Sequence, residues 1–369
     1  MASIKKRPNG SWRARYRDHE GKEHARHFPR KIDAQHWLDE VTTSVRTGRY
    51  VDPGHGRTTL TDYFEEYAAR QLWEAGTERA MRLAVRDCTF AGTPFGKLSR
   101  GHAEHWVKDM STRLAPGTIR TRFNNVHTVI RGAVHDKRLP EDFMRGVRLP
   151  STGSTEHKLR IPTPEQVGMI LGASEDHTRT FWAVCAFAGL RLGEAAGLRA
   201  EDIDIEGRTI RIERQVQRAP GGVEVREPKY GSQRTVYAPD SLTTMLEEHI
   251  GSGVYGDGWL FIGSRGNPPH QNTVGHWWRK TTATAGVTGF VLHDLRHFYA
   301  SGLIAAGCDV VTVQRALGHK KPTVTLNTYS HLWPTAEDRT RAAAQGLIDS
   351  AFGIPADSMR TLSDNMPSD

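Results

Sequence analysis

The sequence predicts a multidomain, mainly α-helical protein, with a small domain of one β-sheet and one helix, an all-α domain and a mixed α+β domain. Strand-like alternation of apolar and polar residues occurs only before residue 30 and in short pieces after residue 208, and helical periodicity dominates elsewhere. Two stretches, 47–58 with Gly and Pro and 149–162 with Gly, Pro and Ser, are typical of linkers. The predicted domains are therefore 1–48, 58–148 and 160–350, and the polar tail 351–369 is predicted to be disordered.

The amino-acid composition indicates which kind of partner and which compartment to expect for this protein. The 369 residues include 50 Lys and Arg against 42 Asp and Glu, a net charge of +8 that fits a nucleic-acid partner. The three cysteines lie far apart in sequence and form no CxxC pair, as in a protein of a reducing compartment. No apolar run is long enough to span a membrane, and the first residues lack the apolar segment of a signal peptide. We therefore expect a soluble, cytoplasmic protein without a membrane partner.

The first domain is predicted to be a three-stranded antiparallel sheet covered by a helix over 31–46. Turns at Pro8-Asn9-Gly10 and Glu20-Gly21 bound a strand in which aromatic or small residues alternate with Arg13, Arg15 and Arg17. Alternation places these three arginines on one face of the sheet. That face either enters a DNA groove or is an ordinary solvated surface.

The second domain is predicted to be helical from Leu60 to about Leu139. Its clearest helix is 117–138, where apolar residues recur every three or four positions. Arg120 and Arg122 lie off this apolar stripe, with Arg131. They either contact DNA phosphates or keep a surface helix in water.

The third domain is predicted to begin at Thr163-Pro164-Glu165, which has the pattern of a helix start. An apolar helix at 181–188 leads to Arg191. The remaining predicted elements are strands at 209–217, 223–227 and 234–238 and helices at 240–250, 271–285 and onward to about 349.

The segment 293–329 concentrates residues suited to phosphoryl transfer. It contains His293-Asp-Leu-Arg296-His297, then His319, then Tyr329. Arginines can hold the charge on phosphate oxygens, imidazoles can move protons, and a tyrosine can act as nucleophile. These residue types predict a DNA strand-transferase.

Three residues upstream extend this pattern. Arg191 follows a Gly-Leu turn at a predicted helix start, where a phosphate is readily bound. Glu194 lies one turn further on, where its carboxylate could orient the Arg191 side chain. Lys229 lies in a predicted hairpin turn, from which a long side chain can reach DNA. Each of them in isolation is more typical of an ordinary surface residue.

A zinc hydrolase is the rival interpretation, because His293 and His297 are four residues apart as in a helical zinc motif. It fits poorly, since Arg296 would place a fixed cation beside the metal and Tyr329 and Arg191 would have no role. No phosphate-binding or dinucleotide-binding glycine loop occurs. We therefore expect neither a metal nor another cofactor.

Taken together, these motifs resemble the tyrosine recombinases, the lambda-integrase type of site-specific recombinase. The resembling motifs are Ala188-Gly-Leu-Arg-Leu-Gly-Glu194, Pro228-Lys229 before Arg234-Thr-Val, His293-Asp-Leu-Arg-His297, Leu317-Gly-His319 and Thr328-Tyr-Ser-His331. The layout also resembles phage and integrative-element integrases, with an arm-binding, a core-binding and a catalytic domain. The run Val236-Tyr-Ala-Pro239 departs from the usual apolar pattern, and the interval from Lys229 to Ser232 is short.

The resemblance implies an enzyme that integrates or excises a phage or mobile element. It implies a 3′-phosphotyrosine intermediate and no ATP. Tyr329 would be the nucleophile, His293 the proton acceptor, Lys229 the acid, and Arg191, Arg296 and His319 the phosphate ligands. Double-stranded attachment sites, a homotetramer, and an excisionase and a DNA-bending host factor are the implied partners. The segment 336–352 would be a helix that packs on its own or a neighbouring subunit. A type IB topoisomerase and a catalytically silent DNA-binding regulator remain as alternatives.

Overall fold

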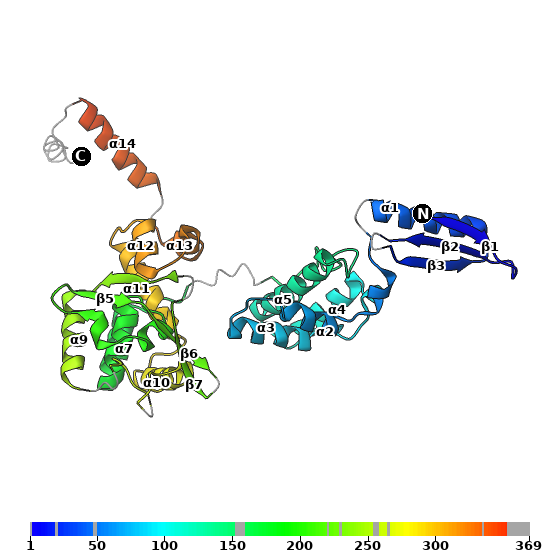
Figure 1. Ribbon diagram of the computed structural model, residues 1–369. Coiled ribbons are helices and arrows are strands. Elements are labelled where there is room, and N and C mark those ends of the chain that lie inside the picture. Colours follow the sequence, from blue (N-terminus) through cyan, green and yellow to red (C-terminus); the bar gives the residue numbers. More distant parts are fainter. Residues whose placement is uncertain are drawn as a thin grey trace. The chain divides into compact units, whose positions relative to one another are not determined.

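The computed structural model describes residues 2–18, 21–46, 50–151, 159–219, 221–228, 231–253, 258–263, 266–333 and 336–352. The chain divides into two compact units, Met1–Glu156 and His157–Asp369 (Figure 1). Most of the predicted tail, from residue 353 on, lies outside the described residues, as does Lys229.

The chain opens with the predicted antiparallel sheet. It consists of β1 (Ser3–Lys6), β2 (Trp12–Arg17) and β3 (Glu23–Phe28), in that order, with α1 (Lys31–Arg46) packed on one face. The predicted turn between β1 and β2 is present, and Gly10 there has φ +82°, a conformation that suits glycine. Ala14 and Tyr16 of β2 are buried toward α1. Arg13, Arg15 and Arg17, which alternate with them, therefore lie on the other face.

The helical part of the first unit contains four α-helices in the described residues: α2 (Leu60–Ala68), α3 (Ala75–Arg86), α4 (Arg100–Ser111) and α5 (Pro116–His135). Short 3₁₀ turns occur at Pro53–Arg57 and Phe95–Lys97. The apolar stripe predicted for α5 is buried, as Ile119, Phe123 and Val126 show. Trp106 of α4 packs in the same core and donates from its indole to the Asp87 carbonyl. The helical prediction for this region is confirmed.

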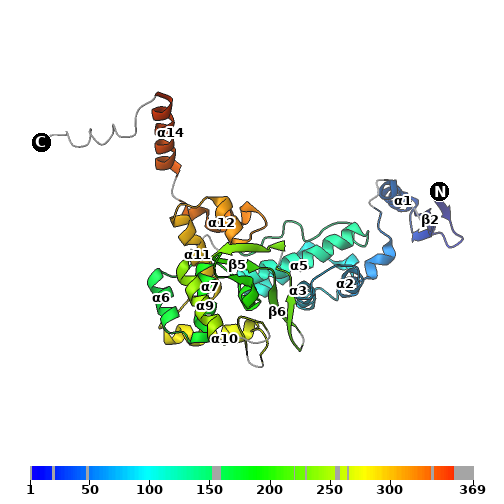
Figure 2. The ribbon, with the colours of Figure 1, turned by 60° about the vertical axis from the view of Figure 1, so that its left-hand side comes forward.

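The second unit begins with α6 (Pro164–Gly172), α7 (Asp176–Phe187) and α8 (Leu192–Ala196). Thr163 and Gln166 form a capping box at the start of α6, as the Thr-Pro-Glu pattern indicates. Helix α7 lies in the middle of the unit and contacts α6, α8, α9 (Asp240–Gly251) and α11 (His293–Ala305). Figure 2 shows α6 at the edge of this unit. Because α7 is surrounded, residues on all of its faces are buried, including Phe181 and Trp182.

The strands of this unit form two small sheets. One has the order β4 (Ile203–Asp204), β5 (Thr209–Ile212), β8 (Arg234–Tyr237), and the other is the hairpin β6 (Gln215–Ala219) with β7 (Gly222–Arg226). The segment 209–217, predicted as one strand, is thus divided between two sheets. Arg214 lies at the break and pairs with the buried Asp202.

The unit ends with further helices: α10 (Gln271–Thr284), α12 (Val310–Leu317), α13 (Pro322–Tyr329) and α14 (Ala336–Phe352). Asp309 caps the start of α12, and Gly318 ends it in the left-handed conformation. Helix α14 leaves Leu347, Ile348 and Phe352 exposed. None of the described helices combines the length and apolarity needed to cross a lipid bilayer.

Candidate active site

Tyr329 is the last residue of α13 and is 1% exposed. Its Oη lies 2.7 Å from Nδ1 of His297 on α11. Burial raises the pKa of Tyr329 to about 12, although Arg296 and Arg191 lower it. The hydroxyl is therefore protonated at neutral pH and needs a base to become a nucleophile.

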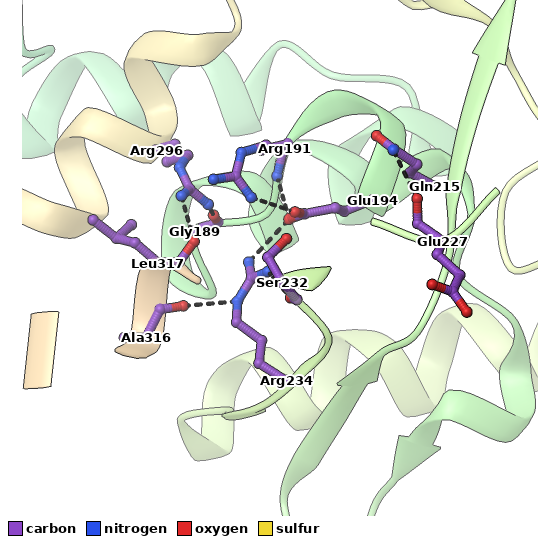
Figure 3. A network of polar contacts seen from close by, with 10 residues as sticks. All are labelled: Gly189, Arg191, Glu194, Gln215, Glu227, Ser232, Arg234, Arg296, Ala316 and Leu317. Carbon is purple, nitrogen blue, oxygen red and sulfur yellow. Dashed lines mark hydrogen bonds and ion pairs between the residues drawn. The ribbon is translucent and has the colours of Figure 1, made fainter. Parts of the chain in front are cut away.

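Arg296 is a buried cation in the same region. Its guanidinium donates to the backbone carbonyls of Gly189 and Leu317, which precede α8 and end α12 (Figure 3). Burial and the neighbouring Arg191 lower the pKa of Arg296 to about 9, so it remains charged at neutral pH. The side chain thereby joins two turns that are distant in sequence.

Arg191 and Glu194 form the pair that the sequence predicts. Arg191 is the residue before α8, and its Nη1 donates to Glu194 Oε1 at 2.6 Å, while its backbone N–H donates to Oε2 at 3.0 Å. Glu194 is 1% exposed and also accepts from Arg234 Nη2 at 2.9 Å. Burial raises the pKa of Glu194, but Arg234 and Arg191 outweigh it and hold the value at about 2. Glu194 is therefore an ionised carboxylate shared by two arginines.

His293 and His319 complete the cluster. Burial and neighbouring cations lower the pKa of each to about 4, so both imidazoles are neutral at pH 7. Nδ1 of His319 lies 2.9 Å from the hydroxyl of Thr325, which is fully buried one turn before Tyr329. The ring of His293 lies edge-on to that of His297, with centroids 4.8 Å apart.

The structure thus brings together Arg191, Glu194, His293, Arg296, His319 and Tyr329. Lys229, the remaining catalytic candidate, lies outside the described residues, between β7 and β8.

Sequence reasoning did not assign a role to three further residues of the cluster. Arg234 contacts Glu194, and Thr325 contacts His319. His297, and not His293, is the imidazole that contacts the Tyr329 hydroxyl. His297 carried a signal, because one helical turn separates it from His293. Arg234 occurs in one of the resembling motifs, but that motif does not indicate its partner, and Thr325 carried no signal. The partners of both residues are set by tertiary packing.

The arginine face of the first sheet has an acidic component. Glu23 of β3 lies 3.5 Å from Arg13 and Arg15 and 3.8 Å from Arg17, measured between guanidinium nitrogens and carboxylate oxygens. Its position follows from the pairing of Arg17 with Glu23 across β2 and β3. All four side chains are partly exposed. The face is cationic, with one carboxylate among its three arginines.

The two arginines of α5 differ in their surroundings. Arg122 is 18% exposed at its side chain and pairs with Asp87 at 2.5 Å. Arg120 is exposed. Arg120 is thus the more accessible of the two cations.

Within the part of the chain that the structure describes, the histidines of α11 belong to no group of three side chains that could share a metal ion. Across the described ranges, the group of three His, Cys, Asp or Glu side chains close enough to share an ion is Asp18, His24 and Asp52, in the first unit. There His24 bonds to Asp18 and Lys22 to Asp52, so the polar atoms already have protein partners. The zinc interpretation of His293 and His297 gains no support from this geometry.

Comparison with known proteins gives a consistent family. The profile of the phage integrase family matches residues 161–335, and that of the phage integrase N-terminal domain matches residues 2–47. A Mycobacterium tuberculosis (strain H37Rv) protein named as a prophage phiRv2 integrase is 26% identical over 363 residues, covering 92% of this chain and 93% of its own. The integrase of Mycobacterium phage D29 is 23% identical over 314 residues, covering 80% and 83%.

Solved structures have the same fold. The Tn1549 transposon integrase in complex with circular-intermediate DNA superposes with a TM-score of 0.66 at 23% identity, covering 79% of this chain and all of the other (100%). A lambda integrase tetramer bound to a Holliday junction gives a TM-score of 0.58 at 16% identity, covering 90% and 94%. The predicted multidomain, mainly α-helical fold is confirmed by these structures. The chain belongs to the phage integrase family and is a tyrosine-type site-specific recombinase.

Proposed function

We propose that the second unit cleaves DNA by attack of Tyr329 Oη on a phosphodiester. The P–O bond to the 5′ oxygen breaks, a 3′-phosphotyrosine bond forms, and a 5′-hydroxyl leaves with a proton. The observation that carries the proposal is the placement of the buried Tyr329 in one cluster with two arginines and three neutral imidazoles. Such a site can stabilise phosphate charge and accept a proton without a metal.

Arg191 and Arg296 would hold the non-bridging oxygens of the phosphate. A guanidinium has five N–H donors, so the bond from Arg191 to Glu194 leaves donors for a ligand. With the Thr325 hydroxyl as the donor to Nδ1 of His319, the neutral imidazole carries its proton on Nε2 and would donate from there to the phosphate. Lys229 is proposed as the acid that protonates the leaving 5′ oxygen, on the basis of its place between β7 and β8.

Two imidazoles are candidates for the proton acceptor. The family resemblance favours His293, whereas the 2.7 Å contact favours His297. Burial lowers the pKa of both below the ordinary value of 6.5, so either is unprotonated at pH 7. Each histidine is replaced separately by Asn, and the cleavage rate of each variant is measured from pH 5 to 9. The proton acceptor is the histidine whose replacement makes the cleavage rate depend most steeply on hydroxide concentration.

Ligation would reverse the first step. The 5′-hydroxyl of a second strand attacks the phosphotyrosine, and Tyr329 leaves with its proton restored. Because the phosphotyrosine preserves the phosphodiester bond energy, no ATP is required.

The remaining parts of the chain would bind DNA and other subunits. We assign 1–48 to arm-type sites through Arg13, Arg15 and Arg17, 58–148 to core sites through Arg120 and Arg122, and 160–350 to catalysis. A tetramer on paired attachment sites is proposed because the related lambda integrase forms one on a Holliday junction. The exposed Leu347, Ile348 and Phe352 of α14 offer a surface for subunit contact.

We further propose that this tetramer integrates or excises its element in the bacterial cytoplasm. An excisionase and a DNA-bending host factor would then determine the direction of the reaction.

One gel tests the proposed function. Supercoiled plasmid carrying candidate attachment sites is incubated with the protein and EDTA. Site-dependent recombinants are expected, whereas relaxation without site dependence indicates a topoisomerase, and a mobility shift alone indicates a regulator. Tyr329→Phe should bind DNA but form no covalent adduct with a nicked suicide substrate. An adduct formed by this variant rules out the assignment of the nucleophile.

A further inference from the structure

Arg234 is a buried cation that the proposed reaction does not yet use. It is the first residue of β8, and its side chain is 7% exposed. Nη2 donates to Glu194 Oε2 at 2.9 Å, Nε to the Ala316 carbonyl at 2.9 Å, and Nη1 to the Ser232 carbonyl at 3.3 Å (Figure 3). A buried guanidinium with three different acceptors is held in one position.

The first contact bears on Arg191. Glu194 carries one negative charge and accepts from both Arg191 and Arg234. Without Arg234, this buried carboxylate would attract Arg191 with its full charge, and a DNA phosphate would have to compete with it. With Arg234 present, the four groups Arg191, Arg234, Arg296 and Glu194 retain a net charge of +2 (three cations less one anion) for the phosphate.

The second contact bears on His319. The last carbonyls of an α-helix lack partners within the helix. At the end of α12, Arg234 binds the Ala316 carbonyl and Arg296 binds the Leu317 carbonyl. A Cβ added to Gly318 would lie 2.9 Å from Arg234 Nη1, so Arg234 packs directly against the turn before His319.

We propose that Arg234 is a positioning residue of the cleavage site. It neutralises Glu194, so that Arg191 remains available to the scissile phosphate. It also fixes the end of α12, so that His319 faces the same phosphate. The inference rests on the proposed function. It adds a fourth cation to the site, one that acts through Glu194 and α12 instead of touching DNA.

The test uses the full-length protein and a nicked duplex bearing the sequence that the wild-type protein selects from a random library. The rate of covalent adduct formation is measured at saturating protein, and duplex affinity is measured separately. Arg234→Gln should lower the adduct rate about 100-fold, comparable to the loss of one oxyanion donor, with affinity changed less than about threefold. Arg211→Gln is the matched control, because it removes an exposed arginine from the adjacent strand β5 and should leave the rate unchanged.

Two further variants separate positioning from a purely structural effect. Arg234→Lys retains the charge beside Glu194 and should recover the rate to within about tenfold of wild type. In Glu194→Gln/Arg234→Gln, the unneutralised carboxylate is absent, so the second substitution should cost less than it does alone. If Arg234→Gln does not fold, the Lys variant decides by itself: a rate about 100-fold below wild type in a folded protein overturns the inference.

The outcomes distinguish this inference from the proposed function. If the wild-type protein forms no adduct, or Tyr329→Phe forms one, the proposed function fails. If the wild type reacts, Tyr329→Phe does not, and Arg234→Gln reacts as fast as wild type, only the assignment of Arg234 fails. Equal rate losses from Arg234→Gln in the wild-type and Glu194→Gln backgrounds would also overturn it, because they would exclude action through Glu194.

Discussion

Replacement of Gly189 by Ala should destabilise the protein and disturb the contact between the Gly189 carbonyl and Arg296. Gly189 has φ +66°, and a Cβ added there would lie 2.9 Å from Cε1 of Tyr299 and closer still to Cδ1. The left-handed conformation costs Ala about 1–2 kcal/mol, and overpacking against a half-buried ring costs about 1–3 kcal/mol more. The expected loss in the free energy of unfolding is therefore about 2–5 kcal/mol.

Gly286 provides a matched control. Its φ is +67°, but nothing lies within 4 Å of an added Cβ. Gly286→Ala should cost the backbone part alone, about 1–2 kcal/mol. For a unit of this size, about 2–4 °C of melting temperature corresponds to each kcal/mol. Calorimetry of the full-length variants should therefore give a fall of about 4–20 °C for Gly189→Ala and about 2–8 °C for the control.

A second substitution tests the steric part. Tyr299→Ala removes the ring that the new Cβ would meet, so the double variant Gly189→Ala/Tyr299→Ala should be more stable than additivity predicts. The adduct rate of Gly189→Ala should also fall, since the Gly189 carbonyl accepts from Arg296. Equal losses from Gly189→Ala and Gly286→Ala, or additivity with Tyr299→Ala, would refute the reasoning.

Three other predictions concern residues around the site and on α5. Thr325→Val removes the hydroxyl that keeps the single N–H of the neutral His319 on Nε2. The lost hydrogen bond, about 1–3 kcal/mol, should slow adduct formation about 5- to 150-fold. Thr325→Ser should retain the rate, and an unchanged rate in the Val variant would contradict the tautomer assignment. The folded-state pKa of Glu194, about 2, lies below its ordinary 4.5, so its contribution is present above pH 4.5 and lost as pH falls toward 2. Unfolding free energies should therefore fall with acid by up to about 3 kcal/mol more in wild type than in Glu194→Gln, and parallel curves would contradict this. Arg120→Gln should reduce the slope of log affinity for DNA against log salt by about 1, and Arg122→Gln by less, because Arg122 is already paired; equal slopes in all three proteins would exclude both phosphate contacts.

Much of the architecture follows from local sequence patterns. The turn at Gly10, the alternation of β2 and the apolar stripe of α5 are each properties of consecutive residues, and all are present in the structure. The strand predicted at 209–217 was placed correctly but not divided. At the break Arg214 pairs with Asp202, and periodicity carries no information about such a pair.

The arginines of β2 illustrate the same limit. Alternation assigns Arg13, Arg15 and Arg17 to one face, but the position of Glu23 among them depends on the register between β2 and β3. The residues of β3 alternate poorly, so the sequence did not define that register. The face predicted to carry the three arginines therefore also contains a carboxylate, whose position the sequence did not predict.

The sequence by itself determined which residues are the candidates for the chemistry, because Arg191, His293, Arg296, His319 and Tyr329 occur in motifs whose order and residue types are specific. The tertiary structure alone decided how these groups are supported and oriented. Arg234 meets a carboxylate 40 residues away and a carbonyl 82 residues away. Side-chain periodicity describes only neighbours on one helix or strand, whereas these bonds depend on how β8, α8 and α12 pack together.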